Sequence, residues 1–73
     1  MKITEHIIGP SRHSTDTIME VSDWASGHSD DEELAGYQGD GFYFVDETEA
    51  SVYGPYKSVE EATRHRNEYW AQL

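Results

Sequence analysis

The segment Gly41 to Val45, with the sequence Gly-Phe-Tyr-Phe-Val, constrains the fold more than any other part of the chain. The chain has 73 residues and no cysteine, so neither a disulfide nor a thiolate-bound metal can hold it together. A domain of this size buries only about 60% of the surface that its unfolded chain exposes. Its core must therefore come from aromatic and aliphatic side chains, and this aromatic, β-branched segment is typical of a strand.

A β-hairpin is expected to begin with this strand. The polar residues Asp46 to Glu49 predict a turn, and Ala50 to Tyr53 predict the returning strand. Because side chains alternate along a strand, Phe42 and Phe44 share one face, and we expect that face to lie on the core. The register of the returning strand stays open at this stage.

A C-terminal helix is expected after Gly54-Pro55, which predicts a turn that ends the hairpin. Ser58 is a natural N-cap, and Glu61 completes a capping box with it. One face of this helix would carry Val59, Ala62, Thr63, Arg66, Tyr69, Trp70 and Leu73. For Arg66 we expect a stem that lies over the core and a head in water. The alternatives are an ion pair with a hairpin acid or stacking on Trp70 or Tyr69.

The N-terminal half gives weaker signals. Lys2 to Ile8 alternates like a strand, and Thr17 to Val21 is compatible with a strand or a helix, with its β-branched content favouring the strand. Ser29 to Glu32 forms a capping box for a short acidic helix that stops at Gly36. We therefore predict one α+β domain over residues 1–73. It has a small antiparallel sheet of three or four strands, a C-terminal helix packed on one face, and the short acidic helix.

The charge distribution is the most unusual property of the sequence. Fifteen acids against five bases give a formal charge of −10, and no Lys or Arg lies between His13 and Tyr56. That span holds eleven acids: Asp16, Glu20, Asp23, Asp30, Asp31, Glu32, Glu33, Asp40, Asp46, Glu47 and Glu49. Such a field repels nucleic acids and membranes and attracts basic surfaces. It serves solubility, adaptation to high salt, or the binding of a positively charged partner in imitation of DNA.

Two resemblances add to this interpretation. The stretch Phe-Tyr-Phe-Val at 42–45, followed by Val-Tyr-Gly-Pro-Tyr-Lys-Ser-Val-Glu-Glu-Ala at 52–62, resembles a module of small uncharacterised phage and prokaryotic proteins. This resemblance covers about a third of the chain and implies a fold element, with no particular activity. In size and charge the chain also resembles acidic phage inhibitors of host defence, including anti-CRISPR and anti-restriction proteins that imitate DNA.

Catalysis and cofactor binding are not indicated. The sequence lacks a cysteine nucleophile, a phosphate-binding glycine loop and the common hydrolase motifs, so we expect no enzyme and no cofactor. The residues His13, His28, Asp30 and Asp31 could meet, but their spacing matches no known metal-ligand pattern. No export signal or membrane span is visible, which favours a cytoplasmic protein, the host cytoplasm if the chain is phage-encoded.

The leading hypothesis is an inhibitor that covers the basic, nucleic-acid-binding surface of a host defence or DNA-processing complex. The acids expected to contact that partner are Asp30, Asp31, Glu32, Glu33, Asp46, Glu47 and Glu49. Trp24 and Tyr37 are the candidate apolar anchors, because Trp and Tyr are enriched at binding hot spots. The chain would act as a monomer or a homodimer. The alternative is a small structural or accessory subunit, for example a homodimer, whose acidity serves solubility only.

Overall fold

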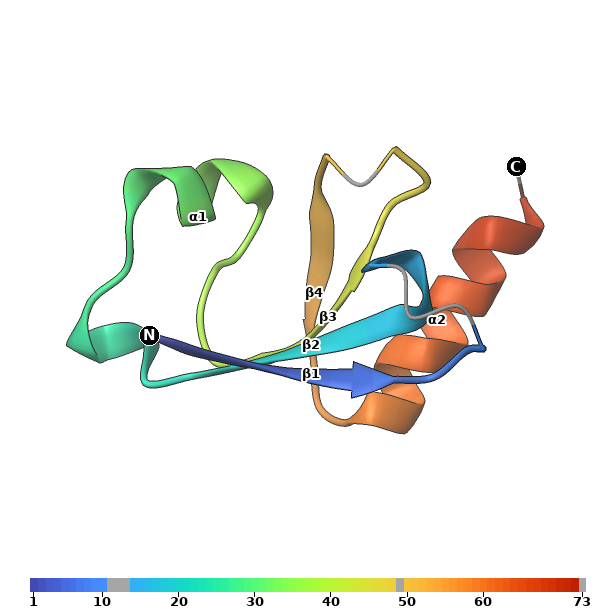
Figure 1. Cartoon of the computed structure of the whole chain (residues 1–73), viewed down its shortest axis with the longest axis horizontal. Helices are drawn as coiled ribbons and strands as arrows, with labels where there is room; N and C mark the ends of the chain where they lie inside the picture. The colour runs from blue at the N-terminus through green and yellow to red at the C-terminus, as the bar shows by residue number, and fades with distance from the viewer. Residues whose placement is uncertain (11–13, 49, 73) are drawn as a thin grey trace.

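The computed structural model describes residues 1–10, 14–48 and 50–72 (Figure 1). In chain order the elements are β1 (Lys2–Ile7), η1 (Ser14–Asp16), β2 (Thr17–Ser22), η2 (Trp24–Ser26), α1 (Asp30–Ala35), β3 (Gly41–Val45), β4 (Val52–Tyr56) and α2 (Val59–Ala71). The described strands form one antiparallel sheet in the order β1-β2-β3-β4. The predicted α+β fold, with a C-terminal helix and a short acidic helix, is confirmed.

Strand β2 is the segment for which the sequence left a strand and a helix open. It pairs with β1 on one side, where Ile18 lies opposite His6, and with β3 on the other, where Ile18 lies opposite Phe44. Ile18 is completely buried. The strand interpretation is therefore correct, and the β-branched residues lie where a doubly paired strand needs them.

The first core lies between the sheet and α2. Its buried residues are Ile18, Phe44 and Ala62, and the half-buried side chains packed on them include Phe42 and Tyr69. The two phenylalanines of β3 thus face the helix, as their alternation predicts. The ring of Phe44 contacts the rings of Tyr53, Tyr56 and Tyr69, with centroids 5.1 to 5.9 Å apart.

A second core lies on the opposite face of the sheet, and the sequence analysis did not foresee it. Val21, Tyr37 and Tyr43 are buried there, with Trp24 and Ala35 packed against them. The long connection between β2 and β3, which carries α1, covers part of this face (Figure 1). The expectation of a single core face, occupied by the phenylalanines, was therefore incomplete.

The pair Gly54-Pro55 does not end the hairpin, contrary to the prediction. Strand β4 runs through both residues to Tyr56, and the register shifts between the pairs Phe44–Tyr53 and Phe42–Tyr56. This bulge inserts one extra residue on β4. Proline is tolerated here because β4 is an edge strand whose outer side needs no backbone donor. Gly54 is required because a Cβ atom there would lie 2.6 Å from the carbonyl oxygen of Phe42.

Arg66 of α2 connects the helix to the segment before β2. Its Nε donates to the carbonyl oxygen of Thr15 at 2.8 Å, and Nη2 lies 2.9 Å from Oδ1 of Asp16. Its guanidinium carbon lies 5.4 Å from the centre of the Trp70 ring. The expectation of a head in water was wrong, because an acid 50 positions away in the sequence reaches the guanidinium. Stacking on Trp70 was the alternative that the structure bears out.

The hydroxyl of Tyr43 offers a test of how the second core is held. It accepts from the N–H of Gln38 at 3.0 Å and donates to the carbonyl oxygen of Gly39 at 2.6 Å. Tyr43→Phe removes both bonds and should lower the free energy of unfolding by about 1–2 kcal/mol, measured by urea denaturation. Tyr56→Phe makes the same chemical change at a half-buried hydroxyl and should cost less. Equal effects of the two changes would mean that the Tyr43 hydroxyl does not stabilise the segment at Gln38 and Gly39.

Candidate functional site

Helix α1 presents most of the predicted acidic site. Asp30, Asp31 and Glu33 are exposed, and no residue of the helix is buried. The predicted capping box is present: Ser29 Oγ accepts the N–H of Glu32, and Oε1 of Glu32 accepts the N–H of Ser29 at 2.9 Å. The backbone hydrogen bond from Ser29, then its hydroxyl, lowers the pKa of Glu32. Glu32 therefore holds the helix start, while its neighbours face solvent.

Leu34 is the functional candidate that the sequence analysis missed. It lies on α1 with 83% of its surface exposed, the highest value among the exposed large hydrophobic residues that the structure describes. Asp31 and Asp30 precede it by three and four positions, so all three share one face of the helix. Leu34 belongs to neither described core, and together with the two aspartates it makes this helix face the candidate contact surface.

The turn between β3 and β4 carries the other predicted acids. Asp46 Oδ1 accepts from the N–H of Thr48 at 3.2 Å, from its hydroxyl at 3.0 Å and from the N–H of Ala50 at 3.0 Å. Burial alone would raise the pKa of Asp46, but these hydrogen bonds outweigh it and lower the pKa. Asp46 therefore shapes the turn. Glu49 lies outside the described residues.

Glu47 ties this turn to the C-terminal helix. Its Oε2 accepts the hydroxyl of Tyr69 at 2.5 Å. The hydrogen bond to Glu47, followed by the one to Tyr53, raises the pKa of the Tyr69 phenol well above its ordinary value. Of the predicted turn acids, Glu47 is thus directed toward α2, and it already has a partner within the chain.

An apolar recess lies between α1 and the hairpin. Its volume is about 200 Å³. It is lined by Met19, Ala35, Tyr37, Val45, Ala50, Ser51 and Val52. Gly36, at the end of α1, has a φ of 112° and lies so close to Val52 that a Cβ atom would collide with its carbonyl oxygen. Helix α1 and the β3–β4 turn lie on the same long side of the molecule in Figure 1. The apolar recess therefore lies next to the helix that carries Asp30 and Asp31.

Trp24 and Tyr37 differ in their accessibility. Tyr37 is 9% exposed and packs edge-on against Tyr43, with ring centroids 5.0 Å apart. Burial, followed by the neighbouring Tyr43, raises the pKa of the Tyr37 phenol. Trp24 is half-buried and stacks on the imidazole of His28, with ring centroids 3.7 Å apart. Trp24 keeps part of its ring at the surface, whereas Tyr37 acts mainly as a support beneath α1.

The described bases neutralise little of this acidic surface. Among the residues that the structure describes, Arg66 is the one Lys or Arg side chain that forms an ion pair with a carboxylate, and it uses Asp16. The remaining described pairs involve histidines, and they are His6–Glu20, His28–Glu33 and His65–Glu68. Asp30 and Asp31 have no ion pair or side-chain hydrogen bond within the described residues. Their charge remains available to an outside partner.

Among residues 1–10, 14–48 and 50–72, no three His, Asp or Glu side chains are grouped as metal ligands; His13 lies outside these ranges. In the same ranges, no helix has the length and apolar character needed to cross a membrane. Comparison of the chain with protein-family models, curated proteins and solved structures found no significant match. The site is therefore argued from its geometry.

The contact between Glu47 and Tyr69 predicts a measurable change in titration. Glu47→Gln removes the charged acceptor, so the pKa of Tyr69 should fall toward its ordinary value near 10. Because folding raises this pKa, the stabilisation is fully present below the unfolded value near 10 and is lost as pH rises through the folded value. NMR titration of the labelled tyrosine rings would measure the shift. Glu60→Gln, a matched change on α2, should leave Tyr69 unaltered; an unchanged pKa in Glu47→Gln would contradict the assignment.

Proposed function

We propose that this chain is a protein-binding inhibitor that covers a basic, nucleic-acid-binding surface on a partner protein. The observation that carries the proposal is the face of α1 on which the exposed Leu34 lies beside the unpaired Asp30 and Asp31. Stable interfaces combine an apolar centre with a polar rim, and the apolar recess beside α1 extends this surface toward the hairpin. No bond is made or broken in this function, which requires no cofactor.

Electrostatics would bring the partner to this face. A net charge of −10 accelerates the encounter with a positively charged surface and slows the encounter with nucleic acid. Duplex DNA presents one charge about every 1.7 Å along its axis, and a protein that binds DNA through many phosphate contacts is strongly salt-dependent. The acidic face of α1 would compete for such a surface and share its sensitivity to salt. The mechanism is steric and electrostatic occlusion.

The acidic face can be tested without changing the fold. Asp30→Asn with Asp31→Asn removes two charges that have no described partner, and Glu60→Gln with Glu68→Gln removes two exposed charges from α2. The immobilised protein would be incubated with host lysate at low and high salt, and captured proteins would be eluted with duplex DNA. We expect the α1 variant to weaken capture about tenfold, or about 1.4 kcal/mol, and the α2 variant to retain it.

The leucine provides an independent arm of the same experiment. Leu34→Ala should leave the free energy of unfolding within about 0.5 kcal/mol, because the side chain is exposed. It should nevertheless weaken capture of the same partner. If both double variants lose capture equally, the interaction follows net charge and has no defined face. If the captured proteins are not displaced by DNA, the partner class is wrong.

One observation favours the alternative of a homodimeric accessory subunit. Strand β1 is an edge of the sheet. Ile3 and Ile7 lie on the sheet face opposite α2 and are 43% and 52% exposed. An edge strand with exposed apolar side chains is a template for pairing with another strand. Sedimentation equilibrium tests this alternative. A homodimeric accessory subunit should show twice the monomer mass of 8.3 kDa and return to the monomer in Ile3→Lys, whereas a mass of 8.3 kDa in the unchanged chain would contradict it.

A further inference from the structure

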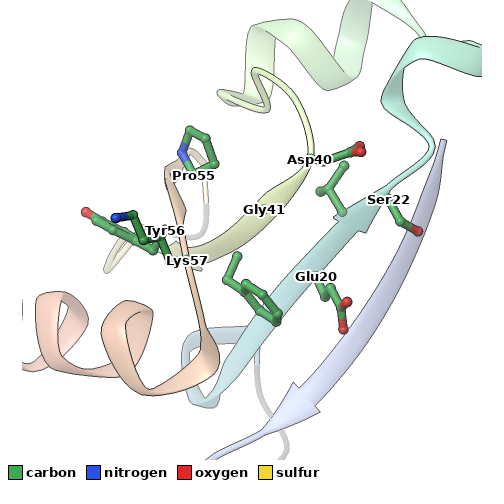
Figure 2. Close-up of a pocket in the computed structure, with 9 residues that line it drawn as sticks. Glu20, Ser22, Asp40, Gly41, Pro55, Tyr56 and Lys57 are labelled. Atoms are coloured by element: carbon green, nitrogen blue, oxygen red, sulfur yellow. The ribbon is translucent and has the colours of Figure 1, made fainter.

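A second groove lies at the end of the sheet opposite the β3–β4 turn, where β2 ends and β3 begins. It has a volume of about 570 Å³ and is open to solvent. Its lining consists of Glu20, Val21, Ser22, Asp40, Gly41, Phe42, Pro55, Tyr56 and Lys57. Figure 2 shows Glu20, Ser22 and Asp40 on one side, and Pro55, Tyr56 and Lys57 on the β4 side. We propose that this groove binds an arginine side chain of the partner protein.

The groove is open because helix α2 covers only part of the sheet face on which it packs. The helix begins at Val59 and packs over Ile18 and Phe44, which leaves the Glu20–Phe42 end of the same sheet face without a helix above it. Gly41 permits β4 to approach closely, because a Cβ atom there would collide with Pro55. The groove is therefore built from backbone that the glycine and the bulge of β4 hold in place.

The two carboxylates are held by contacts that leave room for a cation. Glu20 is 39% exposed and, among the described residues, has one partner, Nε2 of His6, at 2.7 Å from its Oε1. Asp40 is exposed, and its Oδ1 accepts the N–H of Trp24 at 2.9 Å, which fixes the carboxyl group at the rim. A carboxylate that is already held in position needs little reorganisation when a cation enters.

The aromatic side chain in the groove selects among cations. Phe42 is half-buried beside Glu20, and its ring centroid lies 5.9 Å from that of His6. A guanidinium is planar, weakly hydrated and able both to stack on a ring and to form two parallel bonds to a carboxylate. An arginine side chain therefore matches a ring beside a carboxylate better than the compact ammonium of lysine does.

Lys57 limits the site to a single cationic side chain. It belongs to the lining, and Figure 2 places its ammonium across the groove from the carboxylates of Glu20 and Asp40. Glu20, Asp40 and Lys57 give the lining a formal charge of −1. Removing the lysine should therefore tighten binding, whereas removing a carboxylate should weaken it. A general attraction to negative charge would give the same two directions, so a carboxylate outside the groove is needed as the control.

The experiment is an NMR titration of the labelled protein with a capped peptide, Gly-Gly-Arg-Gly-Gly. We expect saturable shifts at the amides of Ser22, Gly41, Phe42 and Lys57, and none with the citrulline peptide, which has the same shape without the charge. Glu20→Gln should weaken binding about fivefold, since a partly exposed charge pair contributes about that factor. Lys57→Met should tighten it.

The matched control is Glu68→Gln, which removes the same charge from an exposed position on α2 that also lies beside a histidine. It should leave the affinity unchanged. Equal loss in both glutamine variants, equal binding of citrulline, or shifts confined to α1 would each overturn the proposal.

This inference rests on the proposed function for the identity of the partner, but the two fail separately. If the arginine peptide does not bind and Asp30→Asn with Asp31→Asn still weakens capture, the groove assignment is overturned and the inhibitor proposal stands. If the peptide binds as described but capture does not depend on α1, the acidic face is not the principal surface, and the groove remains a site for arginine.

Discussion

The side chain of Tyr43 connects the sheet to the segment that carries the acidic helix. Its ring is fully buried beside Val21 and Tyr37, and its hydroxyl holds the backbone at Gln38 and Gly39. Helix α1 contributes no fully buried side chain, and its packing on the second core is through the half-buried Ala35. The orientation of this exposed, charged helix of six residues therefore depends largely on the aromatic ring that anchors its connection in the second core.

Many of the carboxylates have a structural role, and this changes how the charge should be interpreted. Glu32 caps α1, Asp46 holds the hairpin turn, and Asp40 accepts from the backbone of Trp24. A carboxylate that accepts backbone N–H groups stabilises its loop whether or not a partner exists. The total of fifteen acids is therefore weak evidence for function. The stronger evidence is the small group without such a role, Asp30 and Asp31, together with an exposed leucine on the same helix face.

The sequence predicted the structure best where a feature depends on residues close together in the chain. The capping residues Ser29 and Ser58, and the alternation of Phe42 with Phe44, each depend on neighbours within a few positions. The errors involve distant partners. Pro55 is tolerated because β4 is an edge, and Arg66 is paired because Asp16 lies 50 positions away. Leu34 could have been identified, because acids occupy the positions three and four residues before it, so that face of a short helix cannot be apolar.

The short chain explains why binding surfaces and charge occur together. Helix α2 covers one end of the first sheet face, and the α1 connection covers part of the second, so a groove and a recess remain open. Open apolar areas normally favour self-association. Here carboxylates belong to the lining of the groove, and two copies that each carry −10 repel one another. The same charge lowers the energy of a complex with a cationic protein. The net charge therefore opposes self-association through these areas and favours association with a cationic surface.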